Sequence, residues 1–189
     1  MTESAVSPAS WQFDYQRLMA AARDPNDIAT QAFGGVLARF RIQGLDAPAL
    51  TRLFARYFPG TPHTRAELYG GTESGAVRAA LSSEEFSDLL ALLREHRRDD
   101  SQETEWIARA AASACAGENH LWEDMGLPSR ETLSRLIKRY FPTLYYRNTA
   151  NLRWKKFFYK QLCDRAEARL CKAPSCGVCS DHALCFGPE

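Results

Sequence analysis

Apolar residues return with the spacing of an α-helix along nearly the whole chain, and this pattern most constrains the fold. One predicted helix starts at a capping box formed by Ser82 and Glu85. The apolar residues that follow share one helical face: Phe86, Leu89, Leu90 and Leu93. No segment alternates apolar and polar residues as a half-buried strand does. We therefore predict an all-α fold, built as a single helical bundle.

Capping residues, prolines and glycines suggest where the other helices begin and end. The glycine-rich stretch 60–81 is expected to be a loop. Helices are predicted from Trp11 to Arg23, from a cap at Asn26 to about Arg41, from Asp46 to Pro59, around Trp106–Cys115, from a cap at Ser129 to Pro142, and from Asn151 to Leu170.

One internal repeat supports a pseudo-symmetric arrangement. Residues 49–59 (ALTRLFARYFP) align with residues 132–142 (TLSRLIKRYFP) at an offset of 83, with seven identities in eleven positions. Gly44 and Gly126, each followed by leucine, precede the two copies at nearly the same offset. We interpret the repeat as a duplicated helical hairpin. The alternative is that two amphipathic helices have come to share this sequence pattern by chance.

Length and composition place the chain among soluble single-domain proteins. It has 189 residues, of which 45% are hydrophobic and 25% charged. It contains no run of 18 or more apolar residues and no secretory signal in its first ten, so we expect a cytoplasmic protein with reduced thiols and no membrane contact. The expected organisation is a disordered N-terminus (1–10), a helical domain (11–170) and a cysteine-rich, metal-binding tail (171–189).

Positive charge is concentrated in one part of a nearly neutral chain. Residues 129–172 contain twelve Lys and Arg against three Asp and Glu, which gives +9, whereas the whole chain carries +1. This segment is expected to meet an anion or an acidic partner. The sequence pI of about 7.6 argues against general nucleic-acid binding. Within the segment, Trp154, Phe157 and Phe158 are predicted to face the core, and Lys155, Lys156 and Lys160 to point elsewhere.

Four of the six cysteines form a tight run near the C-terminus, with the spacing C-x4-C-x2-C-x5-C. They are Cys171, Cys176, Cys179 and Cys185. Four soft thiolates within fifteen residues can surround a single metal centre.

Three kinds of site compete for this run. Structural zinc sites commonly use two separated C-x2-C knuckles, and only one is present. Disulfides are disfavoured without an export signal. An iron–sulfur cluster is large enough to collect four ligands from one short loop, so the spacing favours a cluster over zinc and zinc over disulfides.

A few other residues are candidate ligands. Cys163 precedes the run by eight residues, His182 lies inside it, and His120 follows Asn119 in a polar connection. Cys115 falls on an alanine-rich apolar face and is expected in the core. The chain lacks a P-loop, a G-x-S-x-G motif and an H-E-x-x-H motif, so we do not expect an enzyme.

The C-terminal half resembles the NifQ family. The resemblance rests on WKKFFYKQLC (154–163), on the four-cysteine run with Cys185-Phe-Gly187, on Asn119-His-Leu-Trp122 ahead of Gly126-Leu127, and on the Tyr140-Phe-Pro142 helix end. It is strong over about residues 105–189. In the N-terminal half only the helical pattern is compatible.

The resemblance implies a role in nitrogen fixation. Proteins of this family are described as carriers of an iron–sulfur cluster that includes molybdenum, and as molybdenum donors for the iron–molybdenum cofactor of nitrogenase. It implies that Cys171, Cys176, Cys179 and Cys185 hold a [4Fe–4S] or Mo–Fe–S cluster, with Cys163, His120 or His182 as possible accessory ligands to molybdenum. The implied partners are the NifEN scaffold and the nitrogenase iron protein NifH. A zinc-stabilised basic binding module and a simple [4Fe–4S] electron carrier are the alternatives from the residues alone.

Overall fold

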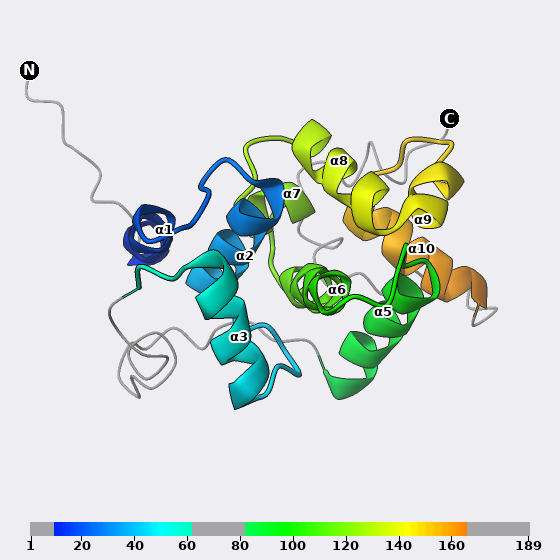
Figure 1. Cartoon of the computed structure of the whole chain (residues 1–189). Helices are drawn as coiled ribbons and strands as arrows, with labels where there is room; N and C mark the ends of the chain where they lie inside the picture. Colours follow the sequence, from blue (N-terminus) through cyan, green and yellow to red (C-terminus); the bar gives the residue numbers. More distant parts are fainter. Residues whose placement is uncertain (1–9, 62–81, 166–189) are drawn as a thin grey trace, which may run out of the picture.

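The computed structural model describes residues 10–61 and 82–165, which form α-helices and connecting turns with no β-strand among them (Figure 1). The all-α prediction is confirmed for this part of the chain. The helices are α1 (Ser10–Ala20), α2 (Ile28–Arg39), α3 (Ala47–Tyr57), α5 (Ser83–Glu95), α6 (Gln102–Ala114), α7 (Leu121–Asp124), α8 (Arg130–Tyr140), α9 (Pro142–Arg147) and α10 (Trp154–Arg165). No helix among the described residues is long and apolar enough to cross a bilayer.

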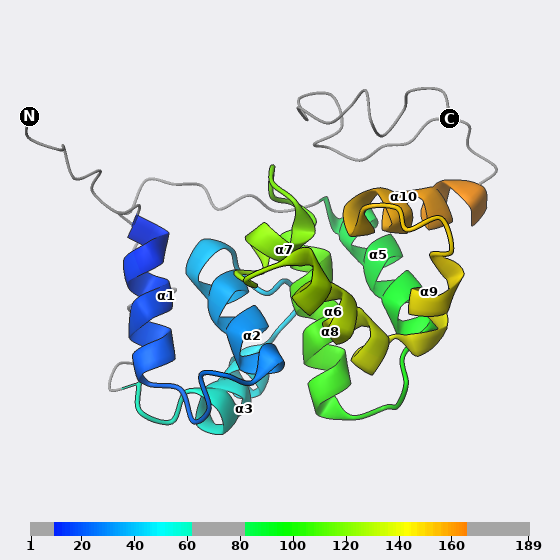
Figure 2. The same ribbon diagram turned by 90° about the horizontal axis from the view of Figure 1, so that it is seen from above.

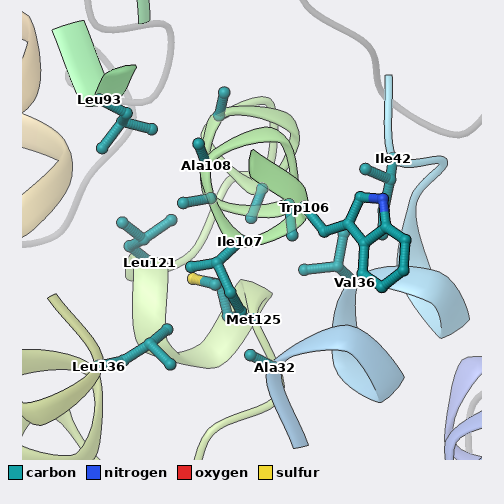
Figure 3. Packing of buried hydrophobic residues seen from close by; sticks show 14 of the residues in the cluster. Ala32, Val36, Ile42, Leu93, Trp106, Ile107, Ala108, Leu121, Met125 and Leu136 are labelled. Carbon is teal, nitrogen blue, oxygen red and sulfur yellow. The ribbon is translucent and has the colours of Figure 1, made fainter. Parts of the chain in front are cut away.

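The core is built around α6, which lies between α2 on one side and α5 on the other (Figures 1 and 2). Its alanines are almost completely buried, and their small side chains let the neighbouring helices approach closely. Trp106 extends toward Val36 of α2, whereas Ile107 extends toward Met125 beyond α7 (Figure 3). From Trp106 to Ala114 every residue of α6 except Arg109 is buried, which places this part of the helix inside the domain.

Polar side chains cap the helices much as the sequence predicts. Asp46 Oδ1 accepts a hydrogen bond from Ala49 N at 2.7 Å, and Ser129 Oγ accepts one from Thr132 N at 3.2 Å. The cap of α2 is Asp27 rather than Asn26, since Asp27 Oδ2 accepts from Thr30 N at 2.9 Å. The predicted cap at Asn26 was wrong by one residue: Asn26 belongs to the preceding turn, where its backbone N–H donates to Asp24 Oδ1.

The two copies of the repeat have matching backbone geometry. Helices α3 and α8 end at Phe58 (φ −129°, ψ 54°) and Phe141 (φ −134°, ψ 59°). The glycines that precede them, Gly44 and Gly126, have positive φ angles of 72° and 65°. Such left-handed backbone favours glycine, which explains why both copies carry one.

The match extends to the chain that leads into each copy. The backbone N–H of Arg23, which follows α1, donates to Tyr57 O at 2.9 Å. The backbone N–H of Arg98, which follows α5, donates to Tyr140 O at the same distance. The same backbone contact therefore recurs at the ends of α3 and α8, and a duplicated helical hairpin stays our interpretation of the repeat.

Several helix boundaries differ from the sequence-based expectation; α1, for example, ends at Ala20 rather than Arg23. Two differences in the second half have a clear cause. Pro142 ends α8 as predicted, but it also starts α9, because proline suits the first turn of a helix. The last helix begins at Trp154 rather than Asn151, which has a positive φ of 50°. The cause is a turn in which Asn148 Oδ1 accepts from Leu152 N at 2.8 Å, so this backbone is not helical.

Candidate functional site

The predicted cluster ligands fall in the part of the chain that the structure does not describe. Cys171, Cys176, Cys179, Cys185 and His182 all lie within 166–189. The structure describes α10, which leads to this segment, and the turn around α7 that carries His120. These two segments contain the sequence blocks 154–163 and 119–127, on which the family resemblance rests.

Aromatic side chains fix α10 to the rest of the domain. Trp154, Phe157 and Phe158 are buried, as predicted. The Trp154 indole donates to Ser134 Oγ of α8 at 3.0 Å and stacks on Tyr145 of α9, with ring centroids 6.1 Å apart. Helix α10 is therefore held on its N-terminal side by α8 and α9.

Lys155 corrects the prediction that the lysines of this helix point away from the core. Its side chain is only 8% exposed. Its ammonium group donates to Asp124 Oδ2 at 2.5 Å and to the carbonyl oxygen of Gly117 at 2.8 Å. Burial of a charge is tolerated here because its partners supply an opposite charge and a backbone acceptor.

Asp124 collects hydrogen bonds from the turn before α7. Its carboxylate is 1% exposed and accepts from Asn119 N at 3.2 Å and from Asn119 Nδ2 at 3.0 Å. An Arg39 nitrogen lies 3.8 Å from Oδ1. Gly117 is needed beside it, because a Cβ at that position would lie 2.2 Å from the carboxylate.

His120 begins the short helix α7 next to this ion pair. Its backbone N–H donates to Glu123 Oε2 at 2.9 Å, and the residue is half-buried. The polar block 117–124 thus folds as one hydrogen-bonded turn around Asp124. The contact of this turn with Lys155 at the start of α10, through Gly117 and Asp124, is the property that the sequence could not show.

A cavity of about 540 Å³ lies on the other side of α7, between α1 and the end of α2. Trp11, Trp122 and Glu123 are among its lining residues. Arg39 also lines it, with its guanidinium 3.5 Å from the centroid of the Trp11 ring. Burial lowers the pKa of Arg39, and the neighbouring Asp124 carboxylate opposes that effect.

The described cysteines differ in their surroundings. Cys115 is completely buried, as predicted, and burial raises the pKa of its thiol to about 12. Cys163 lies half-buried in α10. Within residues 10–61 and 82–165, no group of three or more His, Cys, Asp and Glu side chains is placed to hold a metal ion. Neither His120 nor Cys163 therefore belongs to a metal site formed by described residues alone.

The far end of α10 is fixed to α5. A guanidinium nitrogen of Arg165, the last described residue, lies 2.8 Å from Glu95 Oε2. The adjacent His96 is buried, and its Nδ1 lies 2.8 Å from Thr143 Oγ1. The chain is thus attached to α5 at Arg165, six residues before Cys171.

Sequence reasoning missed Asp124, Gly117 and the burial of Lys155. The signal available was the polar stretch GENHLWEDMG, which is unusually rich in side chains that bond to backbone groups. Lys155, the partner of Asp124 on α10, lies 31 residues farther along the chain, so no local sequence pattern connects the two.

Comparison with known proteins shows similarity to NifQ proteins along most of the chain. The NifQ family model matches residues 26–187. Protein NifQ of Azotobacter vinelandii is 42% identical over 151 residues, which cover 77% of each chain. Protein NifQ of Rhodobacter capsulatus is 36% identical over 156 residues, covering 82% of this chain and 80% of that protein. A NifQ homolog of Sinorhizobium fredii is 38% identical over 146 residues, or 76% of this chain and 60% of that protein.

No solved structure matches this fold. The family model matches every described helix except α1, and it includes the whole four-cysteine run. With matches of this extent, the chain belongs to the NifQ family.

Proposed function

We propose that this protein carries a molybdenum–iron–sulfur cluster and supplies molybdenum for assembly of the nitrogenase iron–molybdenum cofactor. Membership of the NifQ family supports a role in nitrogenase cofactor biosynthesis. The observation that carries the finer proposal is the C-x4-C-x2-C-x5-C run, which lies entirely within the family match.

The proposed ligands to iron are Cys171, Cys176, Cys179 and Cys185. Thiolates suit iron and reduced molybdenum, whereas free molybdate is an oxyanion that needs cationic or amide donors. Molybdenum accepts more ligands than iron does, so we propose that His120, His182 or Cys163 completes its coordination. His120 belongs to the turn that contacts the start of α10 through Lys155, and Cys163 lies near the other end of that helix.

A carrier must hold its cargo and still release it. Helix α10 supports this role because aromatic packing and the Lys155–Asp124 pair fix it to the domain. A cluster held beyond that helix is reached without opening the core. We propose a carrier and not a catalyst, with the NifEN scaffold and NifH as the receiving partners.

The test is metal analysis of protein purified anaerobically from a molybdate-supplied host. The proposal expects iron together with molybdenum, and a broad visible absorption band from sulfur-to-metal charge transfer. Zinc alone in colourless protein would overturn it. A conventional iron–sulfur spectrum without molybdenum would instead favour an electron carrier.

Single alanine variants of the four cysteines test the ligand assignment. Each should lose most of its cluster, while Cys115→Ala, the matched control in the core, should keep iron and molybdenum. If three of the four variants still held a full cluster, the assignment would be wrong. His120→Ala and His182→Ala are expected to keep iron and lose molybdenum, and unchanged molybdenum in both would reject the accessory-ligand proposal for the histidines.

A further inference from the structure

The surface of α8 and α9 combines positive charge with an exposed aromatic ring. Residues 129–165 contain ten Lys and Arg against two Asp and Glu, which gives +8, so the rest of the chain sums to −7. Arg135 and Lys138 are exposed on α8, three residues apart and hence on one face of the helix. Tyr146 of α9 is 64% exposed, which is unusual for a large aromatic side chain in the described chain.

Lys138 and two tyrosines of α9 form one connected cluster. The Lys138 ammonium lies 5.4 Å from the ring centroid of Tyr145 and 5.7 Å from that of Tyr146. The two rings meet edge to face, with centroids 5.2 Å apart, and Tyr145 also stacks on the buried Trp154. Tyr145 is therefore packed against the core and Tyr146 packs on Tyr145, which lowers the entropy cost of burying these rings against another molecule.

The cluster borders the place where the chain enters the cysteine-rich segment. Arg147, next to Tyr146, has a guanidinium nitrogen 3.3 Å from His96 Nε2. Glu95, next to His96, pairs with Arg165 at the end of α10. Figures 1 and 2 show α9 and α10 side by side, at the end of the molecule away from α1.

From this arrangement we infer that Arg135, Lys138, Tyr146 and Arg147, here called the α8–α9 surface, dock an acidic surface of a partner protein. Tyrosine and arginine are enriched at protein interfaces, and charge complementarity speeds association. The whole chain carries a net charge of only +1 and lacks the general basic footprint of a nucleic-acid-binding domain, which favours a protein partner. This inference rests on the proposed function, because it places the partner beside the end of α10, next to the segment proposed to hold the cluster.

Charge reversal tests the inference with a control that the repeat supplies. Arg52 of α3 corresponds to Arg135 of α8 at the offset of 83, and both are exposed. Binding of the anaerobically purified, metal-loaded chain to immobilised NifEN and to immobilised NifH is measured at low and raised salt. Arg135→Glu and Lys138→Glu should each weaken binding to at least one of them by about tenfold, with the larger effect at low salt, while Arg52→Glu changes it less than twofold.

Tyr146→Ala is the second, uncharged test, and should weaken the same complex at both salt concentrations. The inference is overturned if the wild type binds neither protein, if Arg52→Glu weakens binding as much as Arg135→Glu, or if duplex DNA is bound more tightly than both proteins. Thermal unfolding checks that each variant folds, and iron and molybdenum are measured on the same samples. Loss of binding with metal retained supports the surface, whereas a wild type without molybdenum contradicts the proposed function whatever the binding result.

Discussion

Lys155 and Asp124 form a buried ion pair that joins the last described helix to the turn around α7. Their side chains are 8% and 1% exposed, and the Nζ–Oδ2 distance is 2.5 Å. The pair connects the two sequence blocks by which the family is recognised. Because both charges are out of water, each depends on the other for compensation.

Removing one partner should destabilise the domain strongly. Lys155→Met keeps most of the apolar stem but leaves the buried Asp124 carboxylate with only the more distant Arg39 as a cation, at an expected cost of about 3–5 kcal/mol in the free energy of unfolding. Lys160→Met, on an exposed position of the same helix and paired with Asp164, should cost less than about 1 kcal/mol. Urea unfolding followed by circular dichroism measures both. Equal stability of the two variants would mean that the buried pair has no special role.

Two adjacent glycines of α2 should differ in how well they tolerate alanine. A Cβ at Gly35 would lie 2.2 Å from the carbonyl oxygen of Met125 and 2.5 Å from the Cα of Gly126, both backbone atoms that cannot move aside. A Cβ at Gly34 meets the flexible end of Met19 at 2.5 Å. Gly35→Ala should therefore cost at least about 1–3 kcal/mol, whereas Gly34→Ala should be near neutral because alanine favours helices. Thermal melts of the pair check this, and a similar loss in both would refute the close approach of α2 to Gly126.

Local patterns in the sequence predicted the helices and their caps well, since Asp46, Ser82 and Ser129 each act on a backbone group three residues away. They failed at Lys155, because its burial depends on a carboxylate 31 residues earlier in the chain. They also missed α9, whose six residues are too few for a periodic pattern.

In the candidate site too, local features could be predicted from the sequence, whereas contacts between distant residues could not. Cys115 was predicted in the core from its alanine-rich neighbours, and it is there. The spacing of Cys171, Cys176, Cys179 and Cys185 is a local pattern as well, and their role as ligands stays a prediction. What no local pattern provides is the long-range contacts around the site, such as that of Asp124 with Lys155 and that of His96 with Arg147.

Stability should fall in mild acid through His96. Burial lowers the pKa of this histidine, and the neighbouring cations Arg147 and Arg165 act in the same direction while Glu95 opposes them. The folded chain then binds fewer protons than the unfolded one below the ordinary histidine pKa of about 6.5, so the free energy of unfolding falls as pH drops through that value. His96→Gln should remove this part of the slope between pH 7 and pH 5. An unchanged slope in the variant would assign the acid sensitivity to other groups.

Thiol labelling should separate the buried cysteine from the rest of the set. Because burial raises the pKa of Cys115 to about 12 and leaves it without exposed surface, its thiol should resist alkylation by iodoacetamide at pH 8 as long as the domain is folded. Cys163, half-buried near the end of α10, should react faster. Mass spectrometry of peptides from metal-free protein, labelled for increasing times, gives both rates. Full labelling of both cysteines in guanidinium is the control, and native labelling of Cys115 at the rate of Cys163 would show that the α6 end opens readily to solvent.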